Sequence, residues 1–74
     1  MFEKKYRQIG ARIRYYRNIK KLEQAEFAEK TGISRQYLSR LERGASRPSI
    51  DLLFRIADIL EVDVGAIMKD DDNI

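Results

Sequence analysis

One short stretch of the chain, residues 31–44, concentrates side chains that can form paired hydrogen bonds. An Arg offers two parallel donors to the O6 and N7 atoms of guanine, and a Gln pairs in the same way with adenine. Arg and Gln are also good helix formers that often cover solvent-exposed helix faces. The stretch therefore raises two possibilities, recognition of DNA bases or an ordinary exposed helix face. The side chains concerned are Arg35, Gln36, Ser39, Arg40 and Arg43.

Helical geometry separates these side chains from the apolar ones. At about 100° per residue, with Arg35 at zero, the polar set falls at roughly 0–140° and the apolar set at roughly 200–300°. The apolar set is Tyr37, Leu38 and Leu41. Glu42 falls at roughly 340°, on the flank of the apolar side, where it needs a cation beside it. We predict a helix with one buried and one cationic face.

The elements that position this helix can be assigned from apolar spacing and turn residues. An apolar stripe at steps of three and four predicts a first helix, and a short second helix over about 24–31 ends at the flexible Gly32. Further helices are expected over about 49–60 and 63–68, and no stretch alternates as a strand does. Ser34, Ser49 and Asp63 are the expected helix caps. We predict an all-α, five-helix domain over residues 1–69 and an acidic, disordered tail over 70–74.

Charge and composition narrow the class of function. Residues 1–47 hold 13 Lys/Arg and 5 Asp/Glu, a balance of +8, whereas residues 48–74 hold 2 and 7, a balance of −5. This separation favours a polyanionic partner on one side of the molecule. The chain has neither Cys nor His, so we expect no enzyme activity, no metal and no cofactor, and no small-molecule ligand is evident. Without a long apolar run or a signal peptide, we expect a cytoplasmic protein with no membrane partner.

The order of these features resembles a known family. A short helix, a glycine turn and a second helix form a helix-turn-helix, and residues 9–68 resemble the Xre/Cro/C1-type helix-turn-helix family of phage and bacterial repressors and restriction–modification controller proteins. The resemblance rests on the segments 9–14, 22–34, 37–44 and 48–49 and on Leu53, Ile56, Ala57 and Leu60. It implies a lambda-repressor-like bundle that binds double-stranded DNA as a homodimer on an inverted repeat.

The resemblance also implies roles for individual residues. Base contacts would come from the helix that begins near Arg35, and phosphate contacts from the residues around it. The implied base contacts are Arg35, Gln36, Ser39 and Arg40; the implied phosphate contacts are Gln24, Tyr37, Arg43, Ser46 and Arg47. Gln24 would also brace the recognition helix, and Arg17 and Glu42 resemble the family's structural ion pair. The chain departs from the family pattern at Lys21 and Glu61, where glycine is common, and at Glu23, where Ser or Thr is common.

The expected partners include a second copy of the chain. The fourth predicted helix carries more apolar side chains than one core requires, so we place a dimer interface at its end and on the last helix; a core filled within one chain is the alternative. The interface residues are Ile59, Val64, Ile67 and Met68. An antitoxin-type interaction module that represses its own operon is the alternative function. Glu26 and Glu29 either contact RNA polymerase or form a solvated face.

Overall fold

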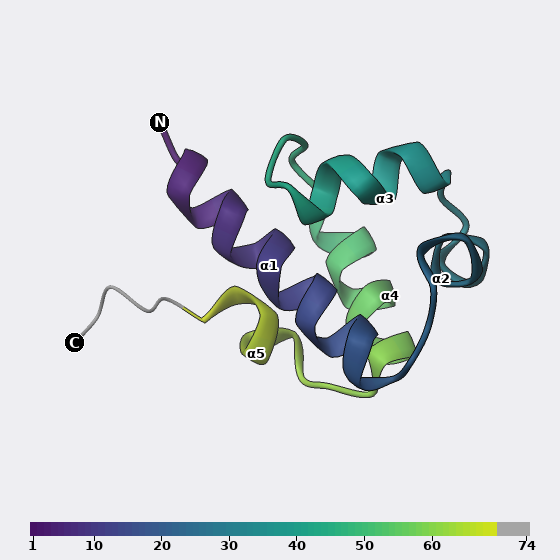
Figure 1. Ribbon diagram of the computed structural model, residues 1–74. Coiled ribbons are helices and arrows are strands. Elements are labelled where there is room, and N and C mark those ends of the chain that lie inside the picture. The colour runs from purple at the N-terminus through teal and green to yellow at the C-terminus, as the bar shows by residue number, and fades with distance from the viewer. Residues whose placement is uncertain (70–74) are drawn as a thin grey trace.

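Five helices follow one another in the computed structural model, which describes residues 1–69 (Figure 1). The bounds are α1 Glu3–Ile19, α2 Gln24–Thr31, α3 Arg35–Glu42, α4 Ile50–Leu60 and α5 Val64–Met68. No strand occurs in this part of the chain, so the all-α, five-helix prediction is confirmed. The predicted acidic tail, 70–74, lies outside the described residues. None of the described helices has the length and apolar character needed to cross a membrane.

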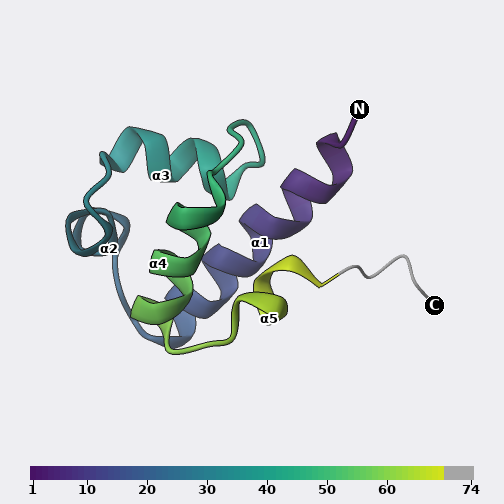
Figure 2. The same ribbon diagram turned by 180° about the vertical axis from the view of Figure 1, so that it is seen from behind.

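The helices wrap a single core. The long α1 packs against α3 and α5, and α2 packs against both α3 and α4. The helix α4 lies behind α1 in Figure 1 and in front of it in Figure 2, while α3 occupies one edge of the molecule in both views. The buried apolar residues come from all five helices, and each is at most 6% exposed: Ile13, Phe27, Ala28, Leu38, Leu41, Leu52, Leu53, Ile56, Ala57, Leu60 and Ile67.

Two of the three expected serine and aspartate caps form. The Ser34 hydroxyl accepts a hydrogen bond from the Tyr37 N–H at 3.0 Å, and the Ser49 hydroxyl accepts one from the Leu52 N–H at 3.1 Å. Each bond satisfies an N–H that has no partner within its own helix. Asp63 stands at the N-cap of α5 without a side-chain cap bond, and its backbone carbonyl accepts from the Ala66 N–H instead. Asp63 therefore stands at the predicted N-cap position, but its side chain does not form the cap bond.

The turn between α2 and α3 depends on a left-handed residue. Gly32 ends α2 with φ 76° and ψ 26°, a conformation that costs glycine nothing because it has no Cβ. After Gly32 the chain reaches extended backbone at Ser34, and α3 begins at the next residue. The second helix of the helix-turn-helix thereby lies across the end of the first at the surface of the molecule (Figure 1).

A close backbone approach joins α1 to α3. A Cβ built on Gly10 would lie 2.1 Å from the backbone oxygen of Leu41 and 2.8 Å from that of Glu42. These distances are far inside van der Waals contact, so only glycine allows α1 to cross the end of α3 at this depth. The crossing fixes the orientation of α3 relative to the longest helix of the fold.

Candidate nucleic-acid interface

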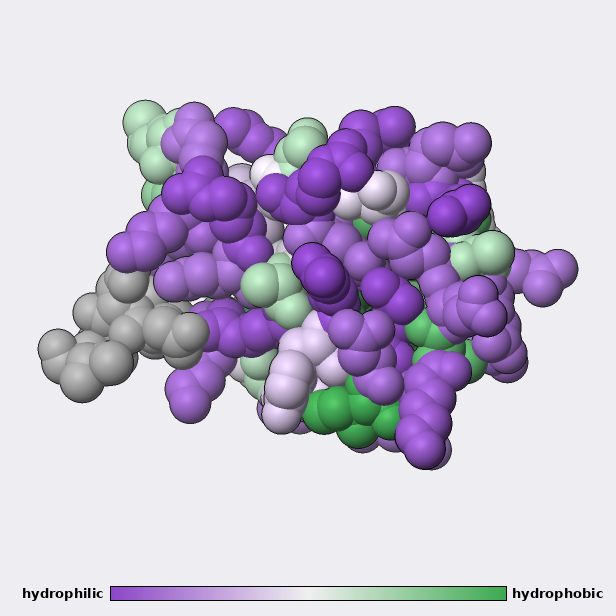
Figure 3. Space-filling model, viewed as in Figure 1, coloured by the Kyte–Doolittle hydropathy of each residue, from purple (hydrophilic) through white to green (hydrophobic). Residues whose placement is uncertain are grey.

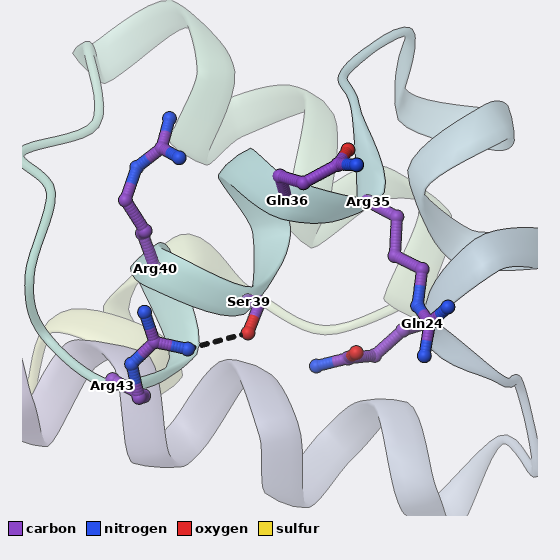
Figure 4. A pocket seen from close by; sticks show the side chains of 6 residues that line it. All are labelled: Gln24, Arg35, Gln36, Ser39, Arg40 and Arg43. Carbon is purple, nitrogen blue, oxygen red and sulfur yellow. Dashed lines mark hydrogen bonds between the residues drawn. The ribbon is translucent and has the colours of Figure 1, made fainter.

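The exposed face of α3 gathers the side chains that the sequence predicts to contact bases. Arg35, Gln36 and Arg40 are exposed and Ser39 is half-buried. Together with Gln24 and Arg43 they line a shallow surface hollow of about 420 Å³ (Figure 4). Figure 3 shows hydrophilic residues over most of the edge that α3 occupies. The structure thus brings all four predicted base contacts onto one cationic, amide-bearing surface.

Internal bonds distinguish the two ends of this surface. Arg43 donates a hydrogen bond from Nη1 to the Ser39 hydroxyl at 2.6 Å, and Arg40 donates from Nε to the Ser46 hydroxyl at 3.4 Å. Within residues 1–69, the side chains of Arg35 and Gln36 make no such bond. These two side chains project from the N-terminal turn of α3 and retain their full hydrogen-bonding capacity for a ligand.

A buried charged network holds α3 in place. Glu42 accepts from Arg17 Nε at 2.6 Å and from Arg17 Nη2 at 3.0 Å, and it accepts from Gln24 Nε2 at 3.0 Å. Arg17 also donates from Nη1 to the Leu22 carbonyl at 2.7 Å. The two charged residues are each 8% exposed. Because each polar group has partners, the network satisfies two buried charges while it joins α1 and α2 to α3.

The remaining predicted phosphate contacts lie beside α3. Tyr37 is half-buried, and its ring lies 5.6 Å from the guanidinium carbon of Arg40. In the loop after α3, Ser46 is half-buried and Arg47 is exposed, with the Arg47 guanidinium 5.4 Å from the ring of Tyr6. This cation–π contact ties the loop to the first turns of α1. The structure therefore places the loop cation, Arg47, beside the first turns of α1.

Two features that support the site were absent from the sequence predictions. The Thr31 hydroxyl donates to the carbonyls of Phe27 and Ala28 at 3.1 and 3.0 Å, and Arg55 of α4 donates from Nη1 to the Thr31 carbonyl at 2.7 Å. Together they close the C-terminal end of α2 before the turn into α3. The charge of an Arg beside a helix C-terminus stabilises the helix, because that end carries a partial negative charge. Arg55 and Thr31, however, are 24 positions apart in the sequence. No local pattern in the sequence signals such a bond.

The predicted dimer surface on α5 requires a correction. Ile67 is 0% exposed because α5 turns this side chain into the core between α1 and α4, so it has no surface to offer a partner. Ile59 and Val64 are half-buried and pack against the same core, and Met68 alone of the four is substantially exposed, at 45%. Much of the predicted interface is therefore interior to a single chain.

Exposed apolar side chains occur instead around the first turns of α1 and α4. A mainly apolar hollow of about 260 Å³ lies between these turns and the end of α5. Phe2 and Ile50 on its border are each 50% exposed, and Met68 completes the border. The full lining is Phe2, Lys5, Tyr6, Ile9, Pro48, Ile50, Leu53 and Met68.

Solved structures share this architecture. The restriction-modification controller protein C.AhdI from Aeromonas hydrophila superposes with a TM-score of 0.84 at 26% identity, over 89% of this chain and 96% of that one. The master regulator for biofilm formation SinR, solved in complex with DNA, superposes with a TM-score of 0.78 at 39% identity, over 82% of this chain and 98% of that one. The similarity extends across the helix-turn-helix and the helices that support it.

Characterised relatives carry the same sequence pattern. The transcriptional regulator SinR of Bacillus licheniformis is 38% identical over 65 residues, and the immunity repressor protein of Bacillus phage phi105 is 38% identical over 63. These matches cover 86% and 85% of this chain but 59% and 44% of the relatives, so the chain spans about half the length of these proteins. The family model described as Helix-turn-helix, HTH_3, matches residues 13–67. With the fold, the α3 surface and these matches in agreement, the chain belongs to the HTH_3 helix-turn-helix family.

Proposed function

We propose that this chain is a sequence-specific regulator of transcription that inserts α3 into the major groove of double-stranded DNA. The observation that carries the proposal is the exposed N-terminal turn of α3, where the side chains of Arg35 and Gln36 make no hydrogen bond or ion pair with other described residues. A helix fits the major groove, and residues at the N-terminal end of a recognition helix commonly contact base edges. Arg35 and Gln36 would read bases, with Ser39 and Arg40 one turn further along.

The residues around α3 are proposed to hold the DNA backbone. Gln24 uses one amide hydrogen to brace Glu42 and keeps a second donor for a phosphate oxygen. Arg43 and Arg47 supply charge at the C-terminal end of α3, with Tyr37 and Ser46 beside them. Contacts to phosphates position a protein without specifying sequence. In this proposal the N-terminal half of α3 contacts bases, and the residues around α3 contact the phosphates of the DNA.

We also propose that two copies bind one inverted repeat. The apolar hollow bordered by Phe2, Ile50 and Met68 lies beside the loop that leaves α3, so a second copy seated there would bring the C-terminal ends of two α3 helices together. Recognition helices on adjacent half-sites of such a repeat would lie one DNA turn apart, ~34–36 Å.

Selection of bound duplexes from a random DNA pool tests the proposal. The expected result is an enriched inverted repeat whose half-sites lie one helical turn apart. Binding to the enriched site should weaken steeply with salt, because each neutralised phosphate releases counterions. Enrichment of a single unpaired motif would overturn the dimer alone. Absence of any enriched sequence would overturn specific recognition itself.

A further inference from the structure

A second polar hollow lies between α1 and α3, and one of its lining residues has no role in the scheme above. It encloses about 280 Å³ and adjoins the hollow in front of α3, with which it shares Gln24, Ser39 and Arg43. Two of its other lining residues, Arg17 and Glu42, belong to the buried network. The remaining one is Arg14, which comes from α1. Arg14 therefore brings a cation from the first helix to the border of the proposed DNA surface.

The charge of Arg14 is not neutralised by the acid that shares this hollow. The Glu42 carboxylate already accepts two hydrogen bonds from Arg17 and one from Gln24. Arg14 is exposed, and within residues 1–69 its side chain makes no hydrogen bond or ion pair. The hollow thus contains an internally compensated pair, Arg17 and Glu42, and two further guanidinium groups, those of Arg14 and Arg43.

This set of groups has the chemistry of a phosphate site. Two guanidinium groups that border one hollow repel each other, and an anion between them removes that repulsion. Arg donors match phosphate oxygens in pairs, and the free amide hydrogen of Gln24 adds a donor of fixed direction, since its other hydrogen is held by Glu42. The alternative is that Arg14 is an ordinary solvated arginine. Such a residue would have no reason to lie beside a second arginine, Arg43, and the amide of Gln24.

We propose that Arg14, together with Gln24 and Arg43, binds a phosphate of the DNA backbone, so that α1 takes part in the interface beside α2 and α3. The proposal rests on the DNA-binding function above and adds a residue to it. Because the Gly10 crossing fixes α1 against the end of α3, a phosphate held by Arg14 would set the depth and tilt of α3 in the groove. Arg14 is thus a positioning residue with no base to read.

Binding titrations of Arg14→Ala test this assignment, with Lys69→Ala as the control. Lys69 is an exposed cation after α5 that lines none of the polar hollows, so its removal changes net charge by the same amount. Arg14→Ala should weaken binding roughly three- to tenfold on both the selected site and random duplex, and lower the slope of log K against log salt by about one. The ratio of specific to non-specific affinity should stay as in the wild type.

Three outcomes separate the possibilities. If Arg14→Ala matches Lys69→Ala in affinity and salt slope while the wild type binds its selected site, the Arg14 assignment fails and the proposed function stands. If the variant loses affinity for the selected site alone, Arg14 reads sequence and the positioning role is wrong. If the wild type binds no duplex, both proposals fall. An unchanged urea midpoint for Arg14→Ala excludes misfolding as the cause of weaker binding.

Discussion

Gly10 shows how one residue sets the geometry of the surface that we propose binds DNA. Its hydrogen faces the backbone of Leu41 and Glu42, at distances that leave no room for a methyl group. Nothing in the sequence around it predicts this, because the approach joins two helices separated by about thirty positions. The caps at Ser34 and Ser49, in contrast, follow from local rules and were predictable. At the residue scale, short-range roles can be read from the sequence and long-range ones cannot.

Replacement of Gly10 by alanine should destabilise the fold. The new Cβ would meet backbone atoms that cannot move independently, so we expect a loss of about 1–3 kcal/mol or more in the free energy of unfolding. Gly65→Ala is the matched control, since a Cβ built on Gly65 would lie 3.1 Å from its nearest neighbour, an oxygen of the flexible Asp63 carboxylate. That variant should be neutral or slightly more stable. Urea denaturation measures both, and equal midpoints for the two variants would contradict the close crossing.

Glu42→Ala should lower stability strongly and affect DNA binding only through the fold. It leaves Arg17 buried without a partner charge, which costs about 3–5 kcal/mol for a buried pair. The exposed pair of Lys20 and Glu61 provides the comparison, and Lys20→Ala should cost less than about 1 kcal/mol. Urea denaturation gives both values. A fully stable Glu42→Ala variant that no longer binds DNA would show that Glu42 acts directly on the ligand.

The five helices themselves were predictable as elements because each has a local signal: an apolar period, a capping serine or a terminating glycine. What the sequence left open is how each helix is rotated about its axis. The helix α5 spans only Val64–Met68, and five residues carry too short a pattern to fix which side faces inward. Packing against α1 and α4 decides it, and that is why Ile67 proved to be core and not interface.

Helix ends contain two strained positions that glycine should relieve. Lys21 has φ 58° and Glu61 has φ 60°, so both adopt the left-handed conformation, at positions where glycine is common in the family. A side chain in this conformation costs roughly 1–2 kcal/mol, part of which glycine returns through its more flexible unfolded state. Lys21→Gly should therefore raise the free energy of unfolding, measured by urea denaturation, by about 0.5–1 kcal/mol. Glu61→Gly should gain less, because it also removes the exposed ion pair with Lys20.

The neighbouring residue supplies the control for this test. Lys20 has φ −75° and ψ −5°, in the right-handed region, so glycine there relieves nothing. Lys20→Gly should lower stability by roughly 0.5–1 kcal/mol, because glycine is the more flexible residue when unfolded and because the exposed ion pair with Glu61 is lost. If both substitutions lower the midpoint by similar amounts, the left-handed conformation at Lys21 stores no strain.

At the scale of the whole molecule, the charge separation along the sequence follows the order of the helices. The basic half contains α1 to α3 and the exposed α3 surface, and the half with the acidic balance begins at the loop before α4. The apolar hollow beside that loop is the surface proposed for self-association. The sequence predicted surplus apolar residues on α4 but could not identify the ones left exposed, because exposure depends on how all the helices pack.

Ile50→Lys should weaken self-association. Ile50 borders the apolar hollow with half its surface exposed, so a charge there would have to be desolvated in an interface. Ile19→Lys is the control, because Ile19 is 57% exposed on the last turn of α1 and lines no part of the hollow. Sedimentation at tens of micromolar should show a dimer for the wild type and for Ile19→Lys, and a shift toward monomer for Ile50→Lys. A wild-type monomer would contradict the proposed interface.

The central claim is that the N-terminal turn of α3 reads bases, and the affinity of Gln36→Ala for specific and non-specific DNA tests it most directly. Loss of a paired contact to a base costs about 1–3 kcal/mol, so affinity for the selected site should fall roughly 10- to 100-fold. Affinity for random duplex should not change, and Asn18→Ala, which removes an exposed amide from α1, should leave both values as they are. Equal losses on both DNAs, or no loss on either, would contradict base reading by α3.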